Sequence, residues 1–548
     1  MGKYIITAAL PYAYSVPHLG NFVGSILPAD VYHRYLKMKE EDVIFICGSD
    51  QHGTPTELAA IKAGVEPEVL ANLMHEKIKK LFMEYECSFT YYGKTHTHEN
   101  KEVVYDIFKE LYKNGYLLER DDLQAYCNVD KRVLTDRLVQ GTCPYCGKKS
   151  ARGDQCDNCG KLLEPKQIIG PFCAICGKSE ITFVKTKNLA LELNKLQDNI
   201  GKFIKKNSKN NWSKDAVNKS LSMIKEGLKP RDITRSMKWG FPVPLAGYEN
   251  SVIYVWVTGL IGYIGITKEW NSNKWQGYWQ NEHTKLIQFF GKDNTIFHTI
   301  IWPGMAIGSK LGFILPYTIK ESQFLNSKTF KFSKSQGVGL NMETALEILE
   351  PDYWRFILMY LYPETADTEF SEDLITQIVN GVMNDNIGNF INRVLKLSKE
   401  NEPLIDMGAD PIEEHVERAE KIVEKYKSSF DNFSIREALQ AIVELSALGN
   451  AIMGNSKPWA TAKLAKTDKN AKKELSEQMV TLLGIAHHIG ILMWPFTPSS
   501  SMKILSYFDV EKEPTLDTIG KKPKANLSKE ITPIFKKLDD SFAKNFQK

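Results

Sequence analysis

Two short apolar runs frame a helical pattern in the first 55 residues of the chain. Residues 4–8 and 43–47 are the apolar runs, and small or polar residues follow each of them. Between them, large apolar side chains recur every three or four residues over 19–31, the period of a helix with one buried face. The pattern predicts a strand, a helix and a second strand, with the helix beginning just beyond the end of the first strand.

Residues 57–92 continue the α/β pattern, and 99–113 predict a further helix before the character of the sequence changes at about residue 116.

The C-terminal third has helical periodicity throughout. A long amphipathic stretch covers 372–399, and the same periodicity predicts helices over 413–430, 435–453, 474–494 and 529–546. The chain is therefore expected to combine an α/β part with a C-terminal helical bundle.

Length and composition set the broad class of the protein. The 548 residues are too many for a single core, and 43% apolar with 25% charged residues is ordinary for a globular protein. No apolar run is long enough to cross a membrane, and the N-terminus has no export-signal pattern. The net charge of +4 is too small to identify a nucleic-acid partner, so any basic surface must be local.

The nine cysteines predict metal sites, since a chain without an export signal favours thiols over disulfides. Three Cys-x-x-Cys-Gly knuckles occur within 35 residues. Two of them together predict a closed, structural zinc site at Cys143, Cys146, Cys156 and Cys159. The third needs partners, which predicts a possible second site at Cys127, Asp130, Cys173 and Cys176. One or two zinc ions remain open.

Two stretches suit phosphate binding. His18-Leu-Gly20-Asn21 begins the first predicted helix, where free backbone N–H groups and the helix dipole attract anions. A lone histidine there is more often a cap or a surface residue. The stretch Lys331-Phe-Ser333-Lys334-Ser suits a clamp on a polyphosphate, although alone it would also fit a solvated basic loop.

Together these two stretches resemble the His-Ile-Gly-His and Lys-Met-Ser-Lys-Ser signatures of class I aminoacyl-tRNA synthetases. The flanking segments ALPYA, GSDQHGTP and FFGKDNTIFHTIIWPGM, with the cysteine knuckles, are similar to the methionyl-tRNA synthetase family over nearly the whole chain. The resemblance implies that ATP binds His18, Gly20, Asn21, Gly291, Asp293, Lys331, Ser333 and Lys334. It assigns the catalytic role to His18, Asn21, Lys331 and Lys334.

An aromatic pocket suits the polarizable thioether of methionine. The resemblance places the methionine site at Leu10, Tyr12, Asp50, Arg235, Trp256, Gly259, Leu260, Tyr263, His298 and Trp302. In it, Asp50 pairs with the substrate ammonium and Arg235 supports the carboxylate end. Thr258-Gly259-Leu260 departs from the family's usual Asp/Glu-Ala-Pro, and Asn294 is more polar than usual, so the shape of the pocket is open. For any one aromatic residue, simple packing in the core is an equal alternative.

Three residues of the helical part match the family's anticodon-contacting positions: Asn389, Arg393 and Trp459. A tryptophan beside an arginine and an amide suits the stacking and reading of unpaired bases. Without the resemblance, a tryptophan packed on the bundle is the favoured alternative. Lysines over 202–231 are interpreted as a solvated helical face rather than a tRNA contact, and His96 and His98 as surface histidines.

The expected fold class is α/β, with a Rossmann-like catalytic domain and a zinc-knuckle connective insertion, followed by an all-α anticodon-binding bundle. The expected boundaries are 1–115 and 232–325 for the catalytic halves, 116–231 for the connective domain, 326–371 for the Lys-Phe-Ser-Lys-Ser loop and stem-contact region, and 372–548 for the bundle. The insertion is short for an editing domain.

The expected activity is that of a methionine–tRNA ligase, which forms methionyl-adenylate from methionine and ATP with Mg²⁺ and passes the acyl group to the terminal adenosine of the tRNA. Initiator and elongator methionine tRNAs are the expected partners of a monomeric, cytoplasmic enzyme. The alternatives are another class I ligase, for leucine, isoleucine or valine, and a non-catalytic tRNA-binding protein derived from a synthetase.

Overall fold

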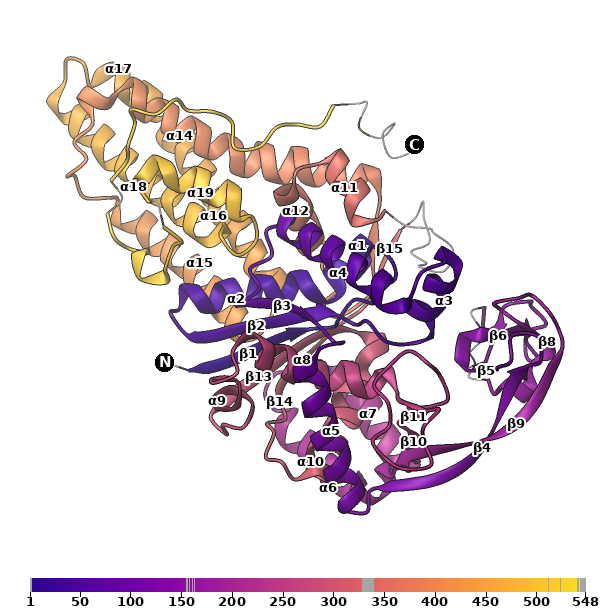
Figure 1. Cartoon of the computed structure of the whole chain (residues 1–548). Helices are drawn as coiled ribbons and strands as arrows, with labels where there is room; N and C mark the ends of the chain where they lie inside the picture. The colour runs from indigo at the N-terminus through magenta and orange to yellow at the C-terminus, as the bar shows by residue number, and fades with distance from the viewer. Residues whose placement is uncertain are drawn as a thin grey trace.

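A five-stranded parallel sheet lies at the centre of the chain in the computed structural model, which describes residues 2–153, 156, 158–159, 161, 163–327, 340–510, 512–522, 524–539 and 542 (Figure 1). Across the sheet the order is β14 (Pro316–Ser322), β13 (Thr284–Gly291), β1 (Lys3–Ala8), β2 (Asp42–Ser49) and β3 (Tyr91–Lys94). All four pairings are parallel. Strand order reverses between β1 and β13, and a parallel sheet forms its ligand crevice at such a point.

Side chains of the central strands alternate between two cores. Ile6 and Phe45 belong to the core that contains α2 (Leu27–Met38) and α4 (Pro67–Glu84). Ile5 and Ile44 belong to the opposite core. The helices of that second face are α5 (His98–Lys113), α6 (Leu193–Asn207), α8 (Val255–Trp270) and α10 (Trp302–Ser309), seen below the sheet in Figure 1. Both faces are covered, which explains why the strands read as continuous apolar runs.

A long antiparallel ribbon carries the cysteine-rich insertion away from the sheet (Figure 1). Its strands β4 (Leu117–Cys127) and β9 (Ile181–Leu191) pair along their whole length. The short strands at its tip are β5 (Arg132–Leu134), β6 (Val139–Thr142), β7 (Ala151–Arg152) and β8 (Ile169–Cys173). The lysine-rich stretch after the ribbon forms two helices, α6 and α7 (Lys214–Glu226). Two short antiparallel pairings lead back to the sheet. In the first, β10 (Arg231–Asp232) pairs with β9, and in the second, β11 (Thr234–Arg235) pairs with β12 (Val252–Ile253).

The C-terminal part is a helical bundle, as its periodicity predicts. The stretch 372–400 is one continuous helical segment, made of α13 (Glu372–Gln377), the π-helical η6 (Ile378–Gly388) and α14 (Asn389–Glu400). The other bundle helices are α15 (Glu413–Asp431), α16 (Ile435–Ser456), α17 (Pro458–Leu464), α18 (Lys469–Met493) and α19 (Pro498–Leu505). Between the sheet and the bundle lie α11 (Met342–Ile348) and α12 (Pro351–Tyr360).

The helix predicted over 529–546 is wrong over residues 529–539, none of which is helical. Residues 529–538, which we call the C-terminal strap, are extended and run beside α14 (Figure 1). Pro533 lacks the N–H that a helix interior needs. Ile534 and Phe535 are both buried in the core of the bundle. The apolar spacing in this segment therefore reflects anchoring into the bundle.

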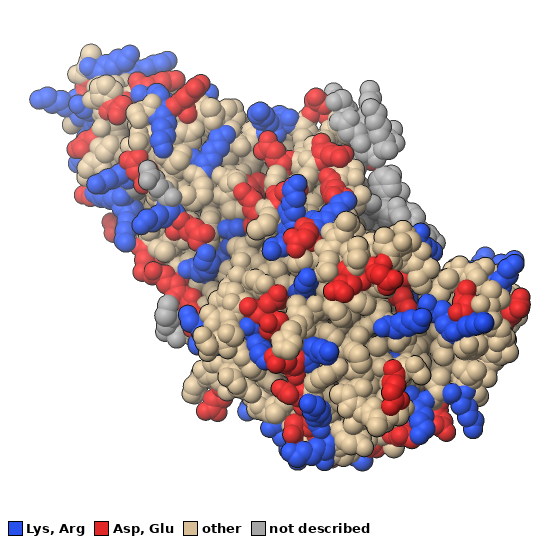
Figure 2. All heavy atoms as spheres, viewed as in Figure 1, with Lys and Arg blue, Asp and Glu red and all other residues tan. Residues whose placement is uncertain are grey.

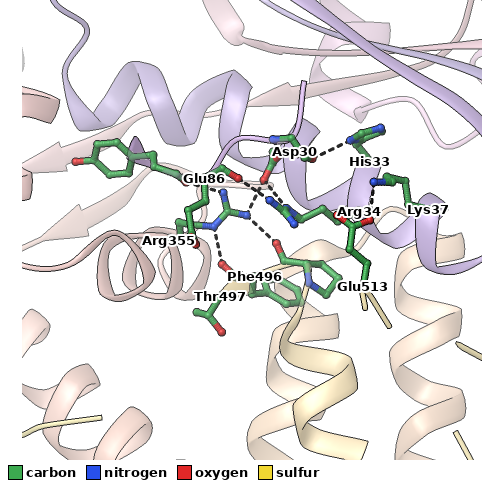
Figure 3. Close-up of polar contacts among 12 residues, drawn as sticks. Asp30, His33, Arg34, Lys37, Glu86, Arg355, Phe496, Thr497 and Glu513 are labelled. Atoms are coloured by element: carbon green, nitrogen blue, oxygen red, sulfur yellow. Dashed lines mark hydrogen bonds and ion pairs between the residues drawn. The ribbon is translucent and has the colours of Figure 1, made fainter. Parts of the chain in front are cut away.

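A buried ionic network joins the sheet layer to the bundle (Figure 3). The Arg355 guanidinium, on α12, donates to the Asp30 carboxylate of α2 at 2.6 Å and to the Phe496 carbonyl at 2.8 Å. Arg34 also lies against Asp30, with Nε 3.3 Å from the same carboxylate oxygen. The side chains of Asp30 and Arg355 are fully buried. Paired charges and carbonyl acceptors compensate their desolvation and fix α2, α12 and the end of α18 relative to one another.

Charge is distributed unevenly over the bundle surface. On the face shown in Figure 2, Lys and Arg side chains protrude at the end of the bundle where α17 lies, with Asp and Glu between them. Among the helices in the described part of the chain, none combines the length and the apolar character needed to cross a membrane.

Candidate functional site

A cavity of about 1100 Å³ opens at the carboxyl ends of β1, β2 and β13, where the strand order reverses. Its walls come from the loop after β1, the following helix start, α8, the residues after β13, and the tip of the cysteine-rich insertion. Of the described residues predicted for ATP and methionine, it brings together His18, Gly20, Asn21, Gly291, Asp293, Leu10, Tyr12, Asp50, Trp256, Gly259, Leu260, Tyr263 and His298. Lys331, Ser333 and Lys334 lie outside the described residues.

His18 and Asn21 cap the first helix through reciprocal hydrogen bonds. The backbone N–H of Asn21 donates to His18 Nδ1 at 3.1 Å, and the backbone N–H of His18 donates to Asn21 Oδ1 at 3.3 Å. This capping box holds the side chains of His18 and Asn21 at the cavity wall. His18 can therefore cap the helix and still face a phosphate in the cavity. At Gly24, one turn further on, a side chain would meet open space, which leaves room for a ligand against the helix.

Asp50 is a buried carboxyl at the deep end of the cavity. Thr95 Oγ1 donates to Asp50 Oδ1 at 3.3 Å and the backbone N–H of His52 does so at 3.4 Å, which are both long contacts. Burial raises the pKa of Asp50 to about 7 because two weak hydrogen bonds do not replace the lost hydration of the charge. A cation brought to this carboxylate would restore the missing partner.

Gly259 leaves space beside that carboxylate. A Cβ atom at this position would lie 3.0 Å from Asp50 Oδ2, closer than ordinary van der Waals contact. Gly259 therefore keeps the approach to Asp50 open on the side of α8. Residues 258–260 differ from the usual Asp/Glu-Ala-Pro of the family, and two of them shape the cavity. Gly259 leaves space beside Asp50, and the larger Leu260 is buried and lines the same cavity.

An apolar, aromatic wall continues from Asp50 along α8. The His298 ring stacks on Phe290 with centroids 4.3 Å apart, and Tyr263 lies 5.9 Å from the same ring. Burial lowers the pKa of His298 to about 3, so the imidazole is neutral at physiological pH. Among the residues that the structure describes, its Nδ1 has no hydrogen-bond partner. Trp256 packs edge-on to Phe297 at the mouth of this wall.

Two of the predicted methionine-site residues do not reach the cavity wall. Arg235 lies on β11, where its guanidinium pairs with Asp232 at 3.3 Å and stacks over the Tyr254 ring at 4.3 Å. Trp302 is 2% exposed and packs edge-on to Trp279 behind the sheet face. Both support the wall from outside in this structure, rather than lining it.

Sequence reasoning missed a histidine pair behind Asp50. His52 Nδ1 lies 2.9 Å from Thr258 Oγ1, and His52 Nε2 lies 2.8 Å from His96 Nδ1. His96 is therefore half-buried in a network and is not the surface residue expected from the sequence; His98, in contrast, is exposed. Burial lowers the pKa of both His52 and His96, so the pair is neutral. It ties the loop that carries Asp50 to α8. Spacing along the chain gave no signal for these contacts, since His96 is 44 residues and Thr258 is 206 residues from His52.

Two clusters of cysteine and aspartate side chains have the geometry of metal sites. In the first, Cys143 Sγ lies 3.8 Å from Cys159 Sγ, and Cys146 Sγ lies 3.7 Å from Cys156 Sγ. Four sulfurs around tetrahedral zinc at about 2.3 Å would be separated by about 3.8 Å, so this set fits zinc. All four ligand atoms lie within 4.8 Å of one another.

The second cluster contains a carboxylate. Cys127 Sγ is 3.6 Å from Cys176 Sγ, and Cys173 Sγ is 2.9 Å from Asp130 Oδ2. These four ligand atoms also lie within 4.8 Å of one another. Backbone N–H groups of the knuckles donate to the sulfurs, as Asp130 N does to Cys127 Sγ at 3.3 Å. The structure thus brings Asp130 to the position of a fourth ligand.

The first metal cluster also approaches the cavity, which the sequence did not predict. Lys148, Lys149 and Ser150, between its two knuckles, line the cavity opposite the helix start, together with Asn158. The tip of the insertion therefore forms one wall of the site.

A second cluster of predicted residues lies on the bundle. Asn389 and Arg393 are on α14 and Trp459 is on α17. The Arg393 guanidinium lies 5.6 Å from the centre of the Trp459 ring. Trp459 is 39% exposed, so it is not the core tryptophan of the alternative interpretation. Stacked cation and indole form a platform open to solvent.

Comparison with known proteins gives matches over nearly the whole chain. A family model described as tRNA synthetases class I (M) matches residues 4–395, and one described as the anticodon binding domain of methionyl tRNA ligase matches residues 407–547. A methionine–tRNA ligase of Pyrobaculum islandicum is 39% identical over 556 residues, covering 100% of this chain and 96% of the relative. That of Thermofilum pendens is 40% identical over 523 residues, covering 92% and 90%.

The fold has solved counterparts. The crystal structure of Mycobacterium tuberculosis methionyl-tRNA synthetase bound by methionyl-adenylate is similar with a TM-score of 0.79 and 21% identity, covering 97% of this chain and 100% of that one. At this identity the likeness concerns the fold: a Rossmann-like catalytic part with a helical anticodon part, as the sequence predicts.

Proposed function

The chain belongs to the methionyl-tRNA synthetase family of class I tRNA synthetases, and on this basis we propose that it activates methionine with ATP and transfers it to methionine tRNA. The observation that carries the proposal is the single cavity whose wall contains a phosphate-suited helix start at one end and the buried carboxyl of Asp50 at the other. Amino acid and nucleotide can therefore meet in one cavity.

Methionine binds with its ammonium at Asp50 in this proposal. The two long hydrogen bonds to Asp50 compensate the charge of its carboxylate only weakly, and the substrate ammonium supplies a positive partner for it. The thioether then lies along the wall of Leu10, Leu260, Tyr263 and His298. Because His298 is neutral, it adds no charge to a pocket that must accept an uncharged side chain. Sulfur beside aromatic rings is favourable, and the unbranched methionine side chain adapts to such a wall.

Adenylate formation follows from this placement. A carboxylate oxygen of methionine attacks the α-phosphorus of ATP, the bond to the β-phosphate oxygen breaks, and pyrophosphate leaves with the electron pair. No side chain needs to take a proton in this step, so positioning and charge stabilisation carry the catalysis. His18 and the N–H groups of the helix start face the phosphates, Gly291 and Asp293 the ribose, and Lys331 and Lys334 are assigned to the leaving pyrophosphate. Mg²⁺ bound with ATP neutralises part of the phosphate charge.

Transfer to tRNA uses the same cavity. A ribose hydroxyl of the terminal adenosine attacks the methionyl carbonyl, and AMP leaves. The anticodon is read at the other end of the molecule by Trp459, Arg393 and Asn389. The exposed Arg393–Trp459 platform supports this role because unpaired bases stack on such surfaces.

Zinc has a structural role in the insertion. Cys143, Cys146, Cys156 and Cys159 would hold one ion, and Cys127, Asp130, Cys173 and Cys176 a second one. Each set supplies four ligands and leaves no position for a reacting water, so the ions support folding. We retain the functional division into 1–115 with 232–325 for adenylation, 116–231 for the connective domain, 326–371 for the loop and stem contact, and 372–548 for anticodon reading. A monomer acting on initiator and elongator tRNAs in the cytoplasm completes the proposal.

Methionine-dependent ATP–pyrophosphate exchange tests the proposal. Assayed with each amino acid in turn, the purified chain is expected to exchange with methionine far faster than with leucine, isoleucine or valine. Charging of methionine tRNA completes the test. Exchange with a branched amino acid instead would identify another class I ligase. A chain that binds tRNA but shows no exchange with any amino acid would be a non-catalytic relative.

A further inference from the structure

A groove of about 410 Å³ lies on the bundle, between the helical segment η6–α14 and the C-terminal strap. It shares no lining residue with the catalytic cavity. Arg393 and Asn389 form part of one wall, so the groove begins at the platform proposed to read the anticodon. The opposite wall comes from the strap, the segment whose sequence predicted a helix.

The strap is held in place by its backbone and by apolar anchors. Phe535 is 1% exposed and packs edge-on to Tyr353. The Leu538 N–H donates to Asn380 Oδ1 at 2.8 Å, and Asn380 Nδ2 donates back to the Leu538 carbonyl at 3.1 Å. The Lys536 N–H donates to Tyr353 Oη at 2.8 Å. None of these contacts uses the Lys536 side chain, which is exposed and lines the groove.

The acidic side chain near the groove is already compensated. Asp385 accepts from Lys537 Nζ at 2.8 Å, from Asn384 Nδ2 at 2.8 Å and from Asn389 Nδ2 at 3.2 Å. These donors lower the pKa of Asp385, the Lys537 hydrogen bond most of all, so it is ionised and satisfied within the protein. It therefore presents little charge against an anionic ligand.

Three cations of the groove have no carboxylate partner among the described residues. Within the described part of the chain, no carboxylate forms an ion pair with Arg393, Lys396 or Lys536. Lys396 lies three residues after Arg393, so both are on the same face of α14. Lys536 faces them from the strap across the groove. The net charge of the groove is positive.

A polar group in the wall is also unused. Asn392, which lines the groove, has a buried Oδ1 that accepts no hydrogen bond from the described part of the chain. An unmade hydrogen bond to a buried acceptor is unfavourable in the free protein. Rotation of the amide presents this acceptor to a donor in the groove, such as a nucleobase amine or a ribose hydroxyl.

We propose that this groove binds single-stranded RNA next to the anticodon platform, with Lys396 and Lys536 on the phosphodiester backbone and Asn392 on an unpaired nucleotide. The inference rests on the proposed function, because it places the tRNA loop at Arg393 and Trp459. It adds a second, sequence-independent contact, built partly by the C-terminal strap. A positive groove with base-accessible polar groups is how proteins follow unpaired strands.

The test uses the full chain and an RNA hairpin that carries the methionine anticodon loop. Lys396→Ala and Lys536→Ala are each expected to weaken binding about three- to tenfold at low salt. Each is also expected to lower the slope of log K against log [salt] by about 0.7, the value for one single-strand phosphate contact. Lys524→Ala is the matched control, since Lys524 is an exposed lysine of the same C-terminal segment outside the groove.

Asn392→Ala separates the neutral contact from the charged ones. It is expected to weaken binding without changing the salt slope, and to leave the melting temperature of the free protein unchanged or higher because an unsatisfied acceptor is removed. A fully paired duplex of equal charge should bind the Lys396 and Lys536 variants as it binds the wild-type protein.

Equal affinity and equal salt slope for Lys396→Ala, Lys536→Ala and Lys524→Ala would overturn the inference and leave the strap as a clamp on the bundle. Equal losses on hairpin and duplex would also overturn it. Failure of the wild-type chain in pyrophosphate exchange and charging would instead contradict the proposed function. The variants should retain wild-type exchange, since no groove residue lines the catalytic cavity.

Discussion

Arg355 Nη2 and Asp30 Oδ2 form an ion pair at 2.6 Å in which both side chains have no solvent exposure. The pair joins α12 to the first helix after the nucleotide loop, and through the Phe496 carbonyl it reaches the bundle (Figure 3). Because the helix that begins at the ATP site and the bundle that carries the anticodon platform share this junction, their relative position depends on it.

Removing one partner of this pair should destabilise the protein strongly. Asp30→Asn would leave the Arg355 charge buried without its carboxylate, and we expect a loss of about 3–5 kcal/mol in the free energy of unfolding. Urea unfolding followed by tryptophan fluorescence measures it. Glu444→Gln, which breaks the half-exposed Lys425–Glu444 pair at 2.6 Å, is the control and should change stability by less than about 1 kcal/mol. Similar small changes for both variants would contradict the role of the buried pair.

The same pair predicts a pH dependence of stability. Burial by itself raises the pKa of Asp30, but Arg355, Arg34 and hydrogen bonds from Ser88 together lower it to about 2 from an ordinary value of 3.8. A depressed pKa stabilises the fold above pH 3.8, and this contribution, about 2 kcal/mol, is lost as pH falls from 3.8 to about 2. The stability difference between the wild-type protein and Asp30→Asn should therefore shrink over that window. A difference independent of pH would show that the charge of Asp30 is not what stabilises the junction.

Methionine binding should depend on the ionisation of Asp50. Burial raises the pKa of Asp50 to about 7 in the free protein, so a growing fraction of the carboxyl is protonated as pH falls through 7. Affinity for methionine is expected to be higher at pH 8 than at pH 6, measured by quenching of tryptophan fluorescence. Asp50→Asn should bind methionine weakly at both pH values. Methioninol, which keeps the ammonium and lacks the carboxylate, should show the same pH dependence as methionine; a flat profile would contradict the ammonium contact.

Metal content should distinguish the two clusters. Purified protein is expected to hold two zinc ions per chain, and Asp130→Ala to hold one, because it removes a ligand from the second set only. Cys146→Ser should lose the first ion and unfold the tip of the insertion, whose small core contains Cys143 and Cys156. Elemental analysis and circular dichroism of the variants measure both effects. A single zinc in the wild-type protein, unaffected by Asp130→Ala, would exclude the second site.

The bundle platform should affect charging and not activation. Trp459→Ala removes a stacking surface worth about 1–3 kcal/mol per base, and Arg393→Ala removes the cation above it. Both variants are expected to lose catalytic efficiency in charging methionine tRNA while pyrophosphate exchange stays near wild type. Since Trp459 is 39% exposed, its loss should lower the melting temperature only slightly. A parallel fall in both reactions would contradict an anticodon role.

The Lys-Phe-Ser-Lys-Ser stretch should act on phosphate. Lys334→Ala is expected to slow adenylate formation about 100- to 1000-fold, the range for loss of one preorganised group that stabilises developing charge. Methionine affinity should change little, since the lysine is assigned to pyrophosphate. Pre-steady-state formation of the adenylate measures the effect, and an unchanged rate would exclude a phosphate clamp.

The sequence by itself determined the local parts of this protein. Apolar runs and helical periodicity gave the strands and most bundle helices, because burial on one face or two leaves a regular pattern. The spacing of the cysteine knuckles predicted the ligands of both clusters that the structure brings together. It could do so because a Cys-x-x-Cys turn depends only on residues close together in the chain. The signatures around His18 and residues 331–335 gave the family. The same rule predicted a helix over residues 529–539, where the chain is not helical and the apolar Ile534 and Phe535 insert into the bundle instead.

Only the tertiary structure decided which distant residues meet. The contact of His52 with His96 and Thr258, the ion pair of Asp30 with Arg355, and the approach of Lys148 and Lys149 to the nucleotide cavity each join segments that no local pattern relates. Arg235 and Trp302 are the opposite case, in which a prediction from residue type did not match the contacts. Both suit a methionine pocket by residue type, but neither lines the cavity, and Arg235 pairs with Asp232 instead. Chain topology sets such distances, because a sheet whose strand order reverses brings the ends of remote strands together. Local periodicity indicates whether a side chain is buried. The packing of helices and strands determines which other residues that side chain contacts.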